Sequence, residues 1–75
     1  MNMGQALEAL KNGDCVSREN WNGPNQFLTL QIPDENSKMS LPYIYITTVQ
    51  GDKVPWFASQ TDILADDWVI DFFEE

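Results

Sequence analysis

The apolar residues near the N-terminus have the spacing of an amphipathic helix. They recur at intervals of three and four residues, at Met3, Ala6, Leu7 and Leu10. This repeat places side chains on one face of an α-helix and predicts a helix over residues 3–12. Asn2 is in position to cap its first turn, and Gly13 is in position to end it.

Beyond this helix the pattern changes to that of β-strands. Short runs rich in aromatic, β-branched or alternating apolar residues predict strands at residues 15–18, 27–32, 43–49, 53–57 and 68–73. The fourth run contains Pro55, and because proline cannot donate to a strand ladder, we expect this strand at an edge of the sheet. Ser59 can cap a short helix over residues 60–65, with Asp62 in its first turn.

These elements predict an α+β fold. The N-terminal helix packs on a small, mostly antiparallel β-sheet, and a short helix precedes the last strand. The 75 residues fit a single domain, residues 1–75. A chain this short buries too little surface to rely on its core alone, so we expect it to form a homo-oligomer.

The charge balance argues against several classes of partner. Twelve acidic and four basic residues give a formal net charge of −8. So few positive charges do not suit the phosphates of DNA or an anionic membrane surface. No apolar run approaches the roughly 18–20 residues of a membrane span, and the start of the chain lacks the pattern of a signal peptide. We therefore expect a cytoplasmic protein.

Groups that could perform catalysis are scarce. The chain has no histidine, and its one cysteine, Cys15, is expected to face the core as a small hydrophobic residue. Glycine-rich phosphate-binding motifs are absent. Asp62 and Asp66 are four residues apart, but two carboxylates supply fewer oxygen ligands than a hard cation takes. We expect no catalytic residue, no metal site and no cofactor.

The C-terminal part of the chain is strongly acidic. The last 14 residues hold six of the twelve acids and no basic residue: Asp62, Asp66, Asp67, Asp71, Glu74 and Glu75. One interpretation is a surface that mimics nucleic acid or docks on a basic protein partner. The other is a solubilising face of a small protein.

Three tryptophans in 75 residues are the most informative feature of the composition. Trp21 lies among turn-forming residues and Trp56 follows a proline at the end of a predicted strand, whereas Trp68 fits the core. An indole outside a core stacks nucleobases, at about 1–3 kcal/mol per base. Alternatively, each indole closes one end of a thin core and its N–H bonds to a loop carbonyl. The sequence leaves both interpretations open for Trp21 and Trp56.

Four segments together resemble one known family. They are residues 3–13 (MGQALEALKNG), 16–23 (VSRENWNG), 41–44 (LPYI) and 54–68 (VPWFASQTDILADDW). In this order they are similar to the Thoeris anti-defence type 2 proteins of phages and prophages, and the last segment is the most specific. The resemblance implies a small antiparallel sheet with short helices. It also implies homodimers or homotetramers with ligand sites between protomers, in the cytoplasm of the host cell.

The function that the resemblance implies is sequestration of a signal. Members of this family with a known activity bind a cyclic ADP-ribose-type immune signal, glycocyclic ADP-ribose, without degrading it, so that the Thoeris effector stays inactive. Some relatives also bind cyclic oligonucleotide signals at a separate site. The alternative hypothesis is an acidic proteinaceous inhibitor that acts on a protein partner.

On the sequestration hypothesis, tryptophan and asparagine side chains recognise the base. Trp21 and Trp56 would stack the adenine or form the wall of its pocket. Asn22 and Asn25 offer amide donors and acceptors to base edges or ribose hydroxyls.

The remaining candidates would bind the ribose and the pyrophosphate. Asp62 is suited to accept hydrogen bonds from a ribose diol. The pyrophosphate needs donors, for which we expect Arg18 and the backbone N–H groups of Ser59, Gln60 and Thr61.

Overall fold

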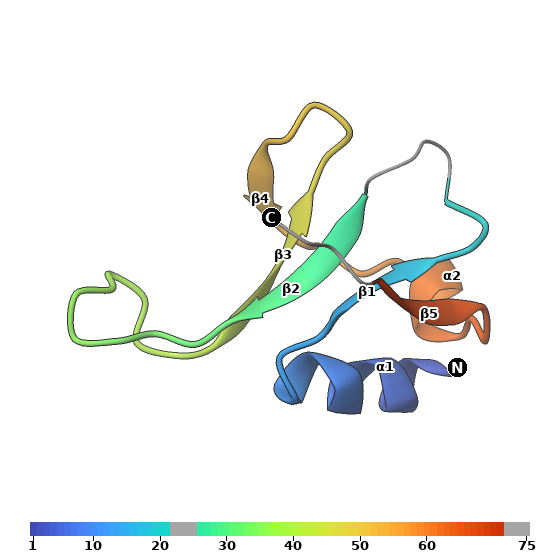
Figure 1. Ribbon diagram of the computed structural model, residues 1–75, viewed down its shortest axis with the longest axis horizontal. Helices are drawn as coiled ribbons and strands as arrows, with labels where there is room; N and C mark the ends of the chain where they lie inside the picture. Colours follow the sequence, from blue (N-terminus) through green and yellow to red (C-terminus); the bar gives the residue numbers. More distant parts are fainter. Residues whose placement is uncertain (22–25, 72–75) are drawn as a thin grey trace.

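The computed structural model describes residues 1–21 and 26–71 (Figure 1). Its elements are α1 (Met3–Lys11), β1 (Cys15–Arg18), β2 (Phe27–Gln31), β3 (Tyr43–Thr47), β4 (Lys53–Pro55), α2 (Gln60–Ile63) and β5 (Trp68–Asp71). The predicted α+β fold is confirmed, with the N-terminal helix, a five-stranded antiparallel sheet and a short helix before the last strand. Several elements end one or two residues earlier than predicted.

The ends of α1 are fixed by the residues that the sequence indicates. The Asn2 side chain accepts a hydrogen bond from the Gln5 backbone N–H, and the Gln5 side chain accepts one from the Asn2 N–H, both at 2.9 Å. This reciprocal pair is a capping box. Gly13 has a φ of +93°, a conformation that costs little only for glycine, and it turns the chain into β1.

The strands form one sheet in the order β4-β3-β2-β1-β5, and every pair is antiparallel. β4 lies at one edge and β5 at the other. Pro55 closes β4 opposite Tyr45, which confirms the expected edge position. The chain reaches β4 through a tight turn in which the Thr48 N–H donates to the Asp52 carbonyl at 2.8 Å, so β3 ends at Thr47.

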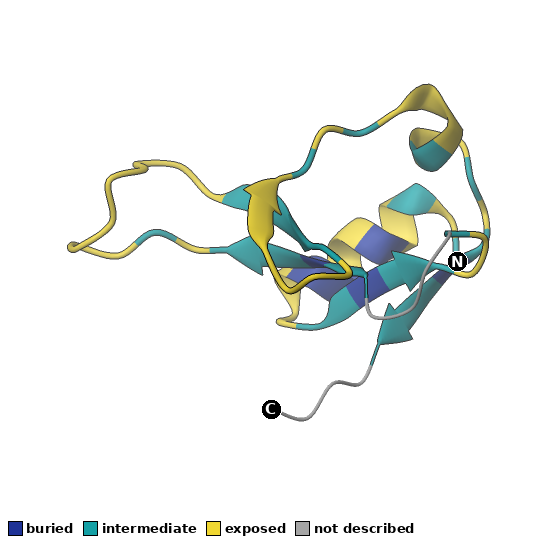
Figure 2. Cartoon of the chain, turned by 90° about the horizontal axis from the view of Figure 1, so that it is seen from above, coloured by how far each residue is buried: buried dark blue, intermediate teal, exposed yellow. Residues whose placement is uncertain are grey.

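The core lies between α1 and one face of the sheet. Strand alternation places Val16, Leu28 and Trp68 on this face, and all three are fully buried. Ala6 and Leu10 of α1 pack against them. Figure 2 shows the buried residues grouped where the helix meets the strands. The prediction that Trp68 belongs to the core is confirmed.

The opposite face of the sheet carries Cys15, so the expectation that this thiol faces the core is wrong. Cys15 is half-buried, and its Sγ lies 3.4 Å from the Thr29 hydroxyl. The reason is the two-residue period of a strand. Its neighbour Val16 takes the core position, which turns Cys15 to the other side.

Residues 32–42 join β2 to β3 as a long arm that extends away from the rest of the sheet (Figure 1). Neither helix of the described residues has the length and apolar character of a membrane-spanning segment.

Candidate functional site

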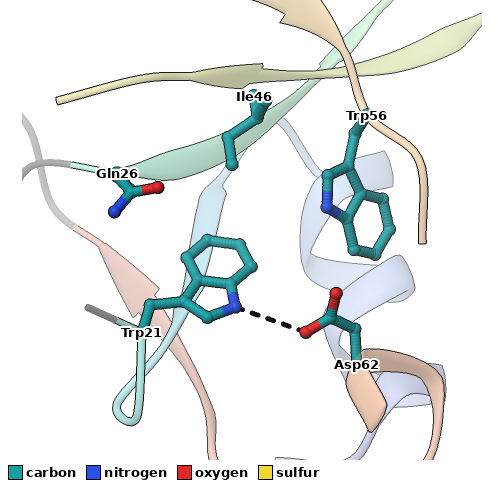
Figure 3. Close-up of a pocket in the computed structure, with 5 residues that line it drawn as sticks. All are labelled: Trp21, Gln26, Ile46, Trp56 and Asp62. Carbon is teal, nitrogen blue, oxygen red and sulfur yellow. Dashed lines mark hydrogen bonds between the residues drawn. The ribbon is translucent and has the colours of Figure 1, made fainter. Parts of the chain in front are cut away.

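A pocket of about 310 Å³ opens beside the second helix, α2. It is lined by Trp21, Gln26, Ile46, Trp56 and Asp62. Figure 3 shows the two indoles on opposite sides, with Ile46 on β3 above them and the Asp62 carboxylate below. Small-molecule sites span about 300–1,000 Å³, so this pocket suits one ring system with part of its substituent.

The two indoles in the pocket are positioned by a third. Trp68 makes edge-to-face contacts with Trp21, at 5.4 Å between ring centroids, and with Trp56, at 5.9 Å. This geometry is favourable for aromatic pairs. Trp68 is fully buried, whereas Trp21 and Trp56 are half-buried. The outer indoles therefore close one end of the core, and they also form the walls of the pocket.

An ion-pair cluster lies next to the pocket. Arg18 on β1 donates from Nη1 to Asp62 Oδ1 at 2.9 Å and from Nε to Asp67 Oδ1 at 2.7 Å. The three side chains are only 12–16% exposed. The Asn20 backbone N–H donates to Asp67 Oδ2 at 3.1 Å. Burying a charged side chain to this extent costs free energy unless it is paired, and each of these three side chains is paired with an opposite charge.

Asp62 connects the cluster to the pocket. Its Oδ1 accepts from Trp21 Nε1 at 3.3 Å as well as from Arg18. Its backbone carbonyl accepts from Trp68 Nε1 at 3.1 Å. Its N–H donates to the Ser59 hydroxyl at 3.1 Å, which caps α2. In Figure 3 the second carboxylate oxygen, Oδ2, points toward the Trp56 side of the pocket.

The cluster keeps both carboxyl groups ionised. For Asp67, the hydrogen bond from Arg18 is the main reason that the pKa lies below its ordinary value. For Asp62, partial burial is the largest effect and favours a higher pKa. The hydrogen bonds from Arg18, Trp21 and Ser59 together outweigh burial, and the pKa is lowered. Hydrogen bonds to Asp67 and Asp62 raise the pKa of Arg18.

Comparison with known proteins identifies the family. The sequence model of the Thoeris anti-defense 2-like domain matches residues 1–70. The chain belongs to the Thoeris anti-defense 2 family. The protein named Thoeris anti-defense 2 from Bacillus phage SP01 is 39% identical over 83 aligned residues, which cover 93% of each chain. Membership implies an anti-defence role, that of a phage protein directed against Thoeris. The resemblance seen in the four sequence segments is thereby confirmed.

Three residues that the sequence predicts for a ligand site come together in the pocket: Trp21, Trp56 and Asp62. They come from the segment after β1, the end of β4 and α2, and they lie within the part of the chain that matches the Thoeris anti-defense 2-like domain. The Asp62 carboxylate accepts from Trp21, so this pair forms one side of the site.

The other predicted residues lie elsewhere. Arg18 is turned toward Asp62 and Asp67 and does not line the pocket. Ser59, Gln60 and Thr61 are exposed at the start of α2, outside the pocket lining. Asn22 and Asn25 fall outside the described residues.

Three residues at the site escaped the sequence analysis. Ile46 was assigned only to a strand, although its alternation with Tyr45 indicates which face it occupies. Gln26 directly follows the turn-rich segment and carries no pattern of its own. Asp67 belongs to an acidic run, and nothing in that run indicates that it pairs with an arginine 49 residues away.

A second hollow, of about 180 Å³, lies near the β4 edge of the sheet. It is lined by Gln31, Tyr43, Tyr45, Lys53, Val54 and Pro55. The Lys53 ammonium lies 5.8 Å from the centre of the Tyr45 ring. Within residues 1–21 and 26–71, no three histidine, cysteine or acidic side chains gather in a way that would hold a metal ion.

Proposed function

We propose that this protein binds glycocyclic ADP-ribose, a cyclic ADP-ribose-type signal, and sequesters it without degrading it, so that the Thoeris effector stays inactive. The observation that carries the proposal is the pocket between Trp21 and Trp56, with a carboxylate on its floor. Family membership supplies the biological setting, a phage protein directed against Thoeris. The pocket supplies the chemistry that a nucleotide requires.

The apolar walls suit the adenine. Trp21 and Trp56 present indole surface from two sides, and Ile46 adds an aliphatic surface between them. Stacking of a base on an aromatic side chain contributes about 1–3 kcal/mol. Both indoles are already held by Trp68, so little side-chain freedom remains to be lost on binding.

The polar floor suits a hydroxyl or amino donor. An ionised carboxylate only accepts hydrogen bonds, and the lowered pKa of Asp62 keeps it ionised at neutral pH. A ribose diol or the adenine amino group satisfies this acceptor, whereas a phosphate would be repelled. We therefore place the nucleoside part of the signal in the pocket and its pyrophosphate outside, toward the exposed residues Ser59, Gln60 and Thr61.

The same chemistry favours binding over turnover. Among the described lining residues, Asp62 is the titratable group, and Arg18 and Trp21 hold it as an anion. General acid–base catalysis works best with a group whose pKa lies near the working pH. The pKa of Asp62 is lowered and lies well below neutral pH. We infer that the protein is not an enzyme.

The pocket accounts for only part of such a ligand, and we propose that a homodimer or homotetramer completes the site. Phe57, next to Trp56, is 94% exposed, and Leu64, two residues after Asp62, is 81% exposed. Large apolar side chains this exposed beside a pocket are suited to contact a second copy. We also propose that the hollow around Tyr43, Tyr45 and Lys53, with its aromatic rings and one cation, takes a cyclic oligonucleotide signal.

The acidic inhibitor receives less support. Asp62 and Asp67, two of the acids that suggested a docking face, are paired with Arg18 and only 15–16% exposed. They are therefore poorly placed to meet a basic partner.

A capture-and-release experiment tests the proposal. The protein is incubated with a panel of cyclic ADP-ribose isomers and cyclic oligonucleotides, separated by filtration and then heat-denatured. Both fractions are analysed by mass spectrometry. Glycocyclic ADP-ribose should vanish from the filtrate and return intact on denaturation. If every compound stays unchanged in the filtrate, sequestration fails and a protein partner becomes the better hypothesis. A ligand that returns cleaved would identify an enzyme.

A further inference from the structure

Two side chains that line the pocket, Trp21 and Asp62, are held in place by residues that do not line it. Arg18 and Asp67 lie beside the pocket, yet their contacts run to Asp62 and to the chain segment that carries Trp21. We propose that Arg18 and Asp67 are positioning residues, which set the Trp21 indole and the Asp62 carboxylate in place before a ligand arrives. The role in binding rests on the proposed function, whereas the positioning itself does not.

The first argument is that the two carboxylate oxygens of Asp62 make different contacts. Arg18 and Trp21 both donate to Oδ1, whereas within residues 1–21 and 26–71 Oδ2 accepts one long contact, 3.5 Å, from the Ser59 N–H. Oδ2 is the oxygen that points toward the Trp56 side of the pocket in Figure 3. Oδ1 therefore holds the Trp21 indole in place, and Oδ2 is left to accept a hydrogen bond from a ligand in the pocket.

The second argument is that Asp67 holds the segment leading to Trp21 at several points. Its carboxylate accepts from the Arg18 side chain and from the Asn20 backbone N–H, and its own carbonyl accepts from the Glu19 N–H at 3.1 Å. The Trp21 N–H then donates to the Arg18 carbonyl at 3.2 Å. Residues 18–21 are therefore tied to the turn between α2 and β5 immediately before the indole that forms the wall.

The third argument is that the helix carrying Asp62 needs such support. α2 has four residues, and a helix this short is not stable by itself. Arg18 reaches it from β1, 44 residues away in the sequence, through a side chain that is 12% exposed. The planar guanidinium directs several N–H groups in fixed directions, so it can hold two carboxylates at once, which a lysine ammonium does not reproduce.

The test compares Arg18→Lys and Asp67→Asn with Asp66→Asn, a matched control. Asp66 is the exposed neighbour of Asp67, so its replacement makes the same charge change outside the cluster. The first readout needs no ligand. It is the hydrogen exchange of the tryptophan indole N–H groups, resolved by nitrogen-15 NMR. The backbone N–H groups of the fully buried strand residues Val16 and Leu28 serve as the internal reference for an intact core.

We expect the Trp21 indole N–H to exchange at least several-fold faster in Arg18→Lys and Asp67→Asn, while the backbone N–H groups of Val16 and Leu28 stay protected and Asp66→Asn matches the wild type. Unchanged protection of Trp21 in both variants would overturn the proposal. Equal loss of protection at the Trp21 indole and at the Val16 and Leu28 backbone N–H groups in both variants would also overturn it, because the residues would then simply hold the fold together.

The second readout is the affinity for glycocyclic ADP-ribose. Ordering a side chain that is no longer held in place costs binding free energy, so both variants should bind on the order of two- to tenfold more weakly than the wild type and Asp66→Asn. Full wild-type affinity in both variants would remove the role in binding. If the wild type itself binds no nucleotide, the proposed function fails, and the exchange measurement still decides whether the two residues position the wall.

Discussion

Trp21 and Asp62, 41 residues apart in the sequence, are joined by a hydrogen bond of 3.3 Å from the indole Nε1 to the carboxylate Oδ1. This bond joins an aromatic wall of the pocket to its acidic floor (Figure 3). The aromatic surface available for stacking and the acceptor for a ribose or amino donor are therefore parts of one unit. A change in either residue is expected to affect both the stacking of the base and the acceptance of a hydrogen bond from the ligand.

Removing the Trp56 indole should weaken nucleotide binding strongly. Trp56→Ala deletes one wall of the pocket, and the loss of about 1–3 kcal/mol of stacking corresponds to roughly a five- to 150-fold lower affinity. Leu41→Ala is the control, because this large apolar side chain is 73% exposed and does not line the pocket. Calorimetric titration with glycocyclic ADP-ribose measures the affinity of both variants. Equal affinities for the two variants would show that the base does not use the Trp56 wall.

The Asp62 charge should be required for tight binding. Asp62→Asn keeps the shape of the side chain but replaces one oxygen with an amide donor. Hydrogen bonds to charged groups contribute about 1.5–3 kcal/mol, so the affinity should fall by roughly ten- to 150-fold. Asp66→Asn, on the exposed neighbouring carboxylate, should bind like the wild type. Wild-type affinity in Asp62→Asn would mean that the ligand does not use this carboxylate.

The small core should tolerate little loss of volume. Leu28 is fully buried between α1 and the sheet, and a buried Leu→Ala change costs about 2–5 kcal/mol. A domain of this size has roughly 4–11 kcal/mol of stability in total, so Leu28→Ala should lower the melting temperature by many degrees. Leu41→Ala, at a side chain that is 73% exposed, should lie within about 0.5 kcal/mol of the wild type. Thermal unfolding followed by circular dichroism compares the pair, and similar melting temperatures would contradict the described core.

Acid should destabilise the fold through the cluster around Arg18. The pKa values of Asp62 and Asp67 are lower in the folded protein than the ordinary value of 3.8, so protons bind the unfolded chain more readily. The stabilisation from these two groups is therefore complete above about pH 4 and is lost as the pH falls through their lower folded values. Urea unfolding across this range measures the effect.

Two asparagine variants test whether the cluster causes this pH dependence, one inside the cluster and one outside it as the control. Asp67→Asn removes a carboxylate whose pKa is lowered by the fold, so its stability should fall less steeply below about pH 4 than that of the wild type. Asp66→Asn should keep the wild-type slope. An equal acid response in all three proteins would show that the ion pair between Arg18 and Asp67 is not formed in solution.

Much of the fold could be predicted because local signals and global packing agree. The spacing of apolar residues in α1, its Asn2 cap and its Gly13 end are local features, and the structure contains all of them. The same holds for the edge position of Pro55 and the Ser59 cap of α2. Cys15 could not be placed on the correct face, because a four-residue strand has too few positions to show an alternation.

The site could be predicted only in part, because it is made by contacts between distant segments. Trp21, Trp56 and Asp62 stood out by residue type and by the family resemblance. The pairing of Arg18 with Asp67 left no such signal, because it joins residues 49 positions apart and Asp67 looks like any other member of an acidic run.

The central claim is that an intact signal nucleotide sits between Trp21 and Trp56. The most direct test is a crystal structure of the protein grown with glycocyclic ADP-ribose. Our account predicts an uncleaved ligand whose adenine lies against an indole of the pocket, with a hydroxyl or amino group donating to Asp62 Oδ2 and the pyrophosphate outside. A nucleotide bound elsewhere with this pocket empty, or a cleaved product in the pocket, would contradict it.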